Sequence, residues 1–267
     1  MNIYKFELKM LIKSIIIWGS SISFGLLLYM AFFPLIMVDN DAMLDLLSSY
    51  PEEFLAFFGM NADLSFTSIM GYFGVTISFI YIPLAIQASL YGVSILSVEE
   101  REYTADFLLT KPISRKQIFM SKFLAAFTAL TIINVLVWIF SFVSLLSFNG
   151  GMTIDYAGAI ILLSSIVLLQ LFFLTVGLLI SVLVRKVTSV IGYSMGLGFG
   201  LYILSSFGKM LSIGFIQALT PYTHFDPVTI LVDRTYNWGY FLINIIVIII
   251  SFSLGYFLYQ KRNIKAL

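Results

Sequence analysis

The chain has 267 residues, of which 60% are hydrophobic and only 11% are charged, and its formal net charge is +1. Soluble domains carry about 25% charged residues, so this composition excludes an ordinary soluble protein and indicates an integral membrane protein. A net charge near zero gives no sign of a nucleic-acid partner. The absence of cysteine excludes a disulfide framework, a thiolate nucleophile and a cysteine-based metal site.

The N-terminal segment, residues 1–14, alternates charged with apolar residues. Lys5, Lys9 and Lys13 recur at every fourth position, which places them on one face of a helix. We therefore expect an amphipathic helix that lies on the membrane surface. The uncharged run that follows is too long for the apolar core of a signal peptide, so no cleavable signal is expected.

Six charge-free runs are long enough to cross a bilayer, since a helical span needs about 20 apolar residues. They are Ser14–Val38, Ile69–Val98, Phe123–Phe148, Tyr156–Val184, Val187–Phe207 and Trp238–Gln260. An even number of spans places both termini on one side. No internal repeat or linker interrupts the runs, so residues 1–267 are expected to form a single all-α membrane domain.

The distribution of basic residues predicts which side the termini face. With six alternating spans, only Lys209 and Arg234 of the 15 Lys and Arg residues fall on the side opposite the termini. The first loop on that side, residues 39–68, is acidic and has no basic residue. Cytoplasmic loops are enriched in Lys and Arg, so both termini are expected to be cytosolic.

The densest charge cluster is EEREYTADFLLTKPISRKQ, residues 99–117, between the second and third spans. Its acidic start suits a helix N-terminus, where the helix dipole favours negative charge. Pro112 predicts the end of that helix, and Ser114 suits the N-cap of the helix that leads into the third span. Phe107 and Leu108 give an apolar side that can seat in a partner's groove. We interpret the segment as a cytosolic docking helix.

Three acidic residues of this cluster, Glu99, Glu102 and Asp106, fall on nearly one face of the expected helix. Charge-assisted hydrogen bonds from such a face to Arg or Lys of a partner contribute roughly 1.5–3 kcal/mol each. The alternative is an ordinary solvated loop whose charges only set the topology.

The connection between the fifth and sixth spans, residues 208–237, contains apolar pieces of 6–10 residues. Such pieces are too short to span a bilayer. We expect re-entrant or interfacial half-helices that are broken at Pro221 and Pro227.

The charge cluster resembles the cytosolic loop between spans two and three of the type-2 family of ABC transporter permeases. The resemblance is carried by Glu99, Glu100, Arg101, Glu102, Thr104, Phe107, Leu108, Leu109, Lys111, Pro112, Ile113, Ser114, Arg115 and, at the opening of span three, Lys122. Tyr103 stands where that family usually has glycine. The surface-lying N-terminal helix, the six spans and the broken segment Ala218–Asp226 are similar to the family as well.

The resemblance implies the membrane subunit of an ATP-driven exporter in a bacterial plasma membrane. The chain lacks the phosphate-binding pattern G-x-x-x-x-G-K-[ST], so it is not expected to be an enzyme, and ATP and Mg²⁺ would be bound by a separate ATPase. Two ATPase copies and a second permease, identical or different, would complete the complex. The implied ATPase-docking residues are Glu99, Glu100, Arg101, Glu102, Tyr103, Thr104, Asp106, Phe107, Leu108, Lys111, Pro112 and Arg115.

Two spans carry small residues at a spacing of four, which lets membrane helices approach closely. Gly192, Gly196 and Gly200 form such a face in the fifth span, and Gly19 and Ser23 form one in the first. In the resembled family, spans one and five meet the second permease, so these residues are candidates for that interface. Packing within one subunit is the alternative.

Residues 192–196, GYSMG, also match G-x-S-x-G, the nucleophile elbow of hydrolases. An intramembrane serine hydrolase is therefore a rival class, with His224 as its base. Ser194 lies about 14 residues, or roughly 21 Å, from the outer end of its span, so His224 would have to reach deep into the membrane. We expect no catalytic residue and, because the chain has a single histidine, no metal site.

Three polar residues within spans, Gln87, Asn134 and Gln170, must hydrogen-bond between helices or line a substrate path, and we name them as pathway candidates. No span is expected to contain a buried Asp, Glu, Lys or Arg, which weighs against the main alternative, an ion-coupled secondary transporter or channel. We expect an amphipathic or hydrophobic cargo. A membrane-active or antimicrobial peptide is the first choice, ahead of a drug, a lipid-linked sugar or an ion-related role.

Overall fold

A computed structural model describes residues 3–38, 40–58, 68–101, 113–184 and 186–261. Within these ranges the chain is helical and contains no strand. Six segments are long and apolar enough to cross a membrane, namely Ile3–Val38, Ile69–Glu99, Arg115–Phe148, Tyr156–Leu183, Val190–Met210 and Trp238–Lys261. Each corresponds to one of the six predicted runs, so the all-α fold with six spans is confirmed.

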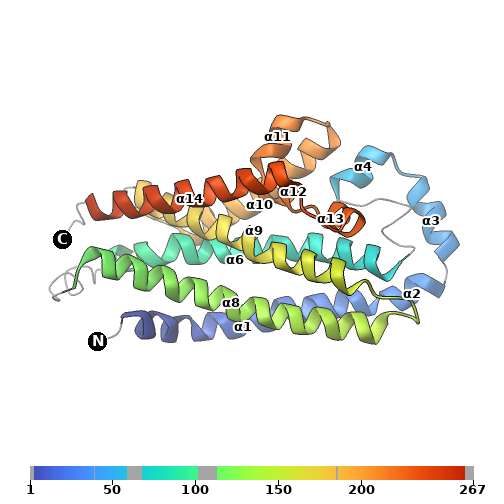
Figure 1. The fold of residues 1–267 in the computed structure, drawn as a ribbon, viewed down its shortest axis with the longest axis horizontal. Coiled ribbons are helices and arrows are strands. Elements are labelled where there is room, and N and C mark those ends of the chain that lie inside the picture. The colour runs from blue at the N-terminus through green and yellow to red at the C-terminus, as the bar shows by residue number, and fades with distance from the viewer. Residues whose placement is uncertain (1–2, 39, 59–67, 102–112, 185, 262–267) are drawn as a thin grey trace.

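The long helices form an elongated bundle with short helices at one end (Figure 1). In chain order the helices are α1 (Ile3–Ala31), α2 (Phe33–Val38), α3 (Asn40–Ser48), α4 (Glu52–Phe57), α6 (Ile69–Arg101), α8 (Arg115–Phe148), α9 (Tyr156–Leu183), α10 (Val190–Met210), α11 (Gly214–Leu219), α12 (Pro221–His224), α13 (Pro227–Asp233) and α14 (Trp238–Lys261). The starts of α1 and α8 and the end of α14 lie together, and we call this the terminal end. We call the opposite end, with α2–α4 and α11–α13, the loop end.

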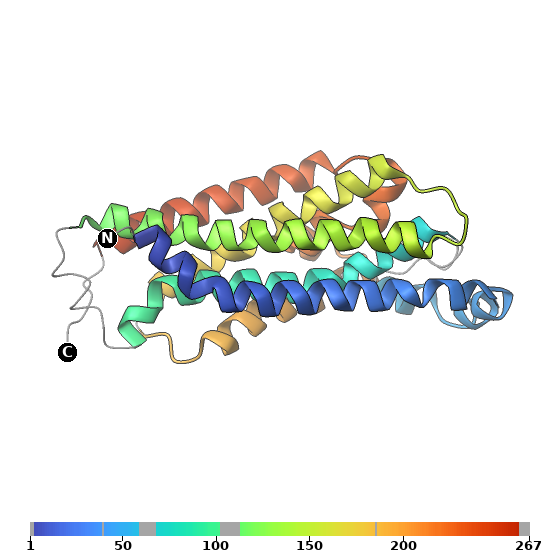
Figure 2. The same ribbon diagram turned by 90° about the horizontal axis from the view of Figure 1, so that it is seen from below.

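The expected surface helix at the N-terminus is continuous with the first span. Residues 3–31 form one α-helix, and Figure 2 shows its first turns inclined to the remainder. Lys5, Lys9 and Lys13 are all exposed on it. At 1.5 Å per residue its 29 residues extend about 43 Å, which exceeds the roughly 30 Å of hydrocarbon in a bilayer. Part of α1 must therefore lie outside the hydrocarbon layer.

Two helix pairs dominate the packing: α1 lies along α8, and α6 lies along α9. In the second pair, glycines allow the backbones of α6 and α9 to come into contact. A Cβ atom placed on Gly92 of α6 would lie 2.3 Å from the carbonyl oxygen of Leu174, and one placed on Gly177 of α9 would lie 3.4 Å from the Gly92 Cα. The α6–α9 crossing therefore leaves no space for a side chain at Gly92.

The segment between α10 and α14 is broken where the sequence predicts. Pro221 and Pro227 are the first residues of α12 and α13. Proline is favoured at this position because its missing N–H has no partner to lose there. The depth of these short helices in a bilayer, and hence their re-entrant character, stays a prediction.

We predict that Gly92→Leu destabilises the protein by at least about 1–3 kcal/mol, the usual range for overpacking, because the new side chain meets the backbone of α9. The measurement is the thermal unfolding midpoint of the purified full-length chain in detergent. Gly25→Ala in α1 is the matched control, since no atom lies within 4 Å of its added Cβ. An unchanged midpoint in Gly92→Leu would refute direct backbone contact between α6 and α9.

Candidate functional site

The terminal end contains a buried cation. Lys122 lies about two turns into α8, and none of its side chain is exposed to solvent. Its Nζ atom lies 2.6 Å from Oε1 of Glu7 in α1 and 2.5 Å from Oε1 of Glu99 in α6. The two carboxylate side chains are 14% and 17% exposed. Three helices thus meet at one ammonium group, and we call Glu7, Glu99 and Lys122 the Lys122 cluster.

The Lys122 cluster was not predicted, and the burial of Lys122 within the span Arg115–Phe148 corrects the expectation that no span contains a buried charged residue. The sequence nevertheless holds a signal for the cluster. Glu7 is the one acidic residue among the first 38, and it sits among lysines on a segment expected to be basic. A buried ammonium is strongly destabilising unless it is paired. Because Lys122 is fully buried, its two carboxylate partners are required for the α1–α6–α8 arrangement.

Neighbouring polar contacts join further helices at the same end. The Tyr4 and Thr128 hydroxyls lie 3.1 Å apart and link α1 to α8. Tyr91 of α6 donates to Ser14 Oγ of α1 at 3.0 Å. Arg115 Nη1, at the start of α8, donates to the carbonyl oxygen of Gln260 in α14 at 3.0 Å.

The start of α8 has the cap that the sequence predicts. Ser114 Oγ accepts from Gln117 N at 3.2 Å, and Ser114 N donates to Gln117 Oε1 at 3.1 Å. This reciprocal pair is a capping box, which satisfies backbone N–H groups that would otherwise have no partner. The direction of the chain into span three is fixed at this cap.

The expected docking residues divide between described and undescribed parts of the chain. Glu99 pairs with Lys122 within the chain, and its expected role in docking stays a prediction. Arg101 ends α6, and Arg115 begins α8. The Glu100 side chain and residues Glu102, Tyr103, Thr104, Asp106, Phe107, Leu108, Lys111 and Pro112 lie outside the described part. The coupling helix and its docking role therefore stay predictions.

The two small-residue faces have different environments. A Cβ atom placed on Gly19 would lie 2.8 Å from Leu136 Cδ1 of α8, and Ser23 is 1% exposed. This face of α1 packs within the chain, which matches the alternative given for these two residues. Gly192, Gly196 and Gly200 are exposed on α10, and their place in such an interface stays a prediction.

The polar residues within the spans are buried among helices. Gln170 Nε2 of α9 donates to Gln87 Oε1 of α6 at 3.2 Å, and both side chains are at most 1% exposed. Asn134 of α8 is 5% exposed. The Gln87–Gln170 pair matches the simpler of the two expected roles, hydrogen bonding between helices.

The geometry does not assemble a hydrolase site from Ser194 and His224. Ser194 Oγ is buried and has no hydrogen-bond partner among the described residues. His224 Nε2 lies 2.9 Å from the carbonyl oxygen of Ala218, an acceptor, so this nitrogen carries the proton. Burial lowers the pKa of His224, which keeps the ring neutral at pH 7. The ring stacks on Tyr240, with 5.3 Å between ring centroids, and serves local packing.

The loop end has ion pairs of its own. Arg234 Nε donates to Asp155 Oδ2 at 2.8 Å, and Lys209 at the end of α10 pairs with Asp226. Asp226 caps α13 by accepting from Thr229 N at 3.0 Å. Burial alone would raise the pKa of Asp226, but the Lys209 ammonium and the Thr229 hydrogen bonds hold it below its usual range. Asp226 therefore stays ionised at neutral pH, and its contact with Lys209 anchors α13 to α10.

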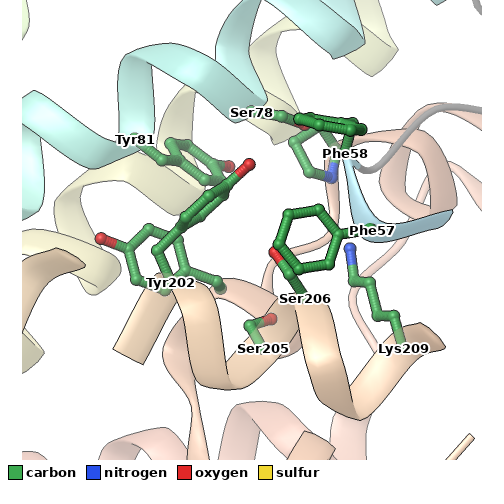
Figure 3. Close-up of a pocket in the computed structure, with 10 residues that line it drawn as sticks. Phe57, Phe58, Ser78, Tyr81, Tyr202, Ser205, Ser206 and Lys209 are labelled. Atoms are coloured by element: carbon green, nitrogen blue, oxygen red, sulfur yellow. The ribbon is translucent and has the colours of Figure 1, made fainter. Parts of the chain in front are cut away.

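Lys209 lines two cavities. A pocket of about 430 Å³ is lined by Ala56, Lys209, Gln217, Thr223, His224, Asp226, Val228, Thr229, Ile230, Thr235, Asn237 and Tyr240. A second cavity, of about 20 Å³, has room for about one water. Figure 3 shows Phe57 of α4 beside Ser206 and Lys209 at this second site. The outer segment α4 thus covers polar groups at the end of α10.

These features define a multi-pass α-helical membrane protein whose charged groups gather at the two ends of the bundle. Its sequence matches the family described as ABC-2 family transporter protein over residues 1–264. The chain therefore belongs to this family and is a transporter permease, as its resemblance to the type-2 permeases predicts. No curated protein matches it.

We predict that Lys122→Met destabilises the protein by about 3–5 kcal/mol, because it leaves the carboxylates of Glu7 and Glu99 side by side without their cation. The thermal unfolding midpoint of the full-length chain in detergent measures the loss. Lys116→Met is the control, since Lys116 is exposed on the same helix. Equal midpoints for the two variants would contradict the structural role of the Lys122 cluster.

Proposed function

We propose that this chain is the membrane-spanning permease subunit of an ATP-driven exporter and that a separate ATPase subunit docks on residues 99–115. The observation that carries the proposal is the Lys122 cluster, together with membership of the ABC-2 family. Residues 102–112 join the end of α6 to the start of α8, and Lys122 ties both helices to α1. A force applied to this connection would therefore reach three helices.

The contacts around the cluster suit the transmission of force. The capping box at Ser114 fixes the start of α8, and the Arg115–Gln260 hydrogen bond connects it to α14. Separating Lys122 from both of its carboxylate partners would leave an uncompensated charge in an apolar environment. Movement at the terminal end is therefore expected to pass into the spans as movement of whole helices.

An external source of energy agrees with the distribution of charge. The stretches 14–38, 69–98, 123–148, 156–184, 187–208 and 238–260 contain no Asp, Glu, Lys or Arg. Ion-coupled transporters generally place ionisable groups at mid-membrane. An amphipathic or hydrophobic cargo fits such spans, with a membrane-active peptide as the first choice and a drug or a lipid-linked sugar next.

The complete assembly would contain two ATPase copies, which bind ATP and Mg²⁺, and a second permease, identical or different. The exposed face of α10 at Gly192, Gly196 and Gly200 is the proposed contact between permeases. Within a bacterial plasma membrane, the excess of basic residues at the terminal end would place both termini in the cytosol.

We predict that an ATPase chain co-purifies with the full-length permease from its native membrane and that Glu102→Lys with Asp106→Lys abolishes this. The reason is that reversed charges would repel the basic groups expected to face this acidic surface. Glu99 is left unchanged, because it supports the fold through Lys122. The measurement is ATP hydrolysis by the isolated complex and identification of the bound chain.

The matched control reverses two acidic residues at the loop end, Asp41→Lys with Asp45→Lys, and should retain the ATPase. Transport by vesicles that lack ATP but have a proton gradient would favour the secondary transporter instead. A Ser194→Ala variant that assembles normally but loses activity would favour the hydrolase.

A further inference from the structure

The Lys122 cluster divides its two carboxylates between the two helix pairs of the bundle. Glu7 belongs to α1, which packs along α8, the helix that carries Lys122 itself. Glu99 belongs to α6, which packs along α9. One ammonium group thus has one partner inside its own helix pair and one partner in the other pair.

The two ion pairs differ in the other contacts that hold their helices together. On the Glu7 side, the Tyr4–Thr128 hydrogen bond provides a second polar contact between α1 and α8. Figure 2 shows these two helices adjacent at the terminal end. On the other side, α6 packs mainly along α9 and makes far fewer contacts with α8 than α1 does. Less packing must be lost to separate α6 from α8 than to separate α1 from α8, so the Glu99 contact is the easier one to release.

Because Lys122 has two carboxylate partners, one partner can move away while the other stays paired. If the end of α6 separated from α8, Lys122 would still be paired with Glu7 and would not become an uncompensated buried charge. If Glu7 were absent, the same separation would leave Lys122 alone. The Tyr91–Ser14 hydrogen bond lies eight residues before Glu99, or about 12 Å along α6, and would serve as the pivot.

We propose that Glu7 is the permanent partner of Lys122 and Glu99 its releasable partner, so that the α6–α9 pair can swing from the α1–α8 pair during the transport cycle. Glu7, Glu99 and Lys122 are then positioning residues for transport. This inference rests on the proposed function, because the ATPase would supply the force that releases Glu99. It predicts opposite effects for the same substitution at two positions. Glu99→Gln favours the state in which α6 is separated from α8, and Glu7→Gln opposes it.

The experiment measures the separation directly in the full-length permease in lipid nanodiscs. The chain has no native cysteine, so introduced pairs can be spin-labelled without background. Val98→Cys with Lys116→Cys reports the distance between α6 and α8. Lys9→Cys with Lys116→Cys reports the distance between α1 and α8 and is the reference pair. The distance in each pair is measured by pulsed electron paramagnetic resonance, once without a further substitution, once with Glu7→Gln and once with Glu99→Gln.

In the permease alone, Glu99→Gln should raise the ratio of separated to closed α6–α8 distances by about tenfold, as expected for loss of one hydrogen bond to a charged group. Glu7→Gln should lower that ratio, and the reference distance should not change in either variant. When an ATPase co-purifies, a non-hydrolysable ATP analogue should populate the separated state in the original chain but not in Glu7→Gln.

Shifts in the same direction for both glutamine variants would overturn the inference, as would an equal shift in the reference pair. A cooperative unfolding transition in each variant, measured in the same detergent, verifies that both variants are folded. Because the first comparison needs no ATPase, it decides the roles of Glu7 and Glu99 even if the proposed partner is wrong. Failure of an ATPase to co-purify would instead contradict the proposed function.

Discussion

The arrangement of the terminal end depends on one buried ammonium group. Lys122 has no contact with solvent, so it must remain paired with Glu7 or Glu99 as long as the bundle is folded. This requirement fixes the relative positions of α1, α6 and α8 at the point where the chain carries most of its basic residues.

Ion pairs join helices at both ends of the bundle. At the terminal end, Lys122 of α8 pairs with Glu7 of α1 and Glu99 of α6. At the loop end, Lys209 of α10 pairs with Asp226, the N-cap of α13, and Arg234, the C-cap of α13, pairs with Asp155, the N-cap of α9. Between the ends, the spans are joined by close packing and by hydrogen bonds between neutral groups such as Gln87 and Gln170. Among the described residues, the ion pairs therefore lie at the two ends of the bundle, with neutral polar groups between them.

The positions where sequence reasoning differed from the structure share a cause. The pattern at residues 99–117 correctly indicated a charged segment between two spans, but it did not show that Glu99 turns inward. The small face at Gly19 and Ser23 correctly indicated close packing, but α8 of the same chain occupies it. A pattern on one helix shows that a partner exists, whereas the partner's identity depends on contacts between distant segments.

The sequence by itself determined the six spans, the common side of the two termini, the breaks at Pro221 and Pro227, the Ser114 cap and the permease family. These follow from local quantities: the length of apolar runs, the placement of charges and the backbone limits of proline. Only the tertiary structure decided that Glu7, Glu99 and Lys122 meet, since their pairing joins residues up to 115 positions apart. The physical reason is that a helix's hydrophobicity can be calculated from its own residues, whereas the burial of a charge depends on which other helices surround it.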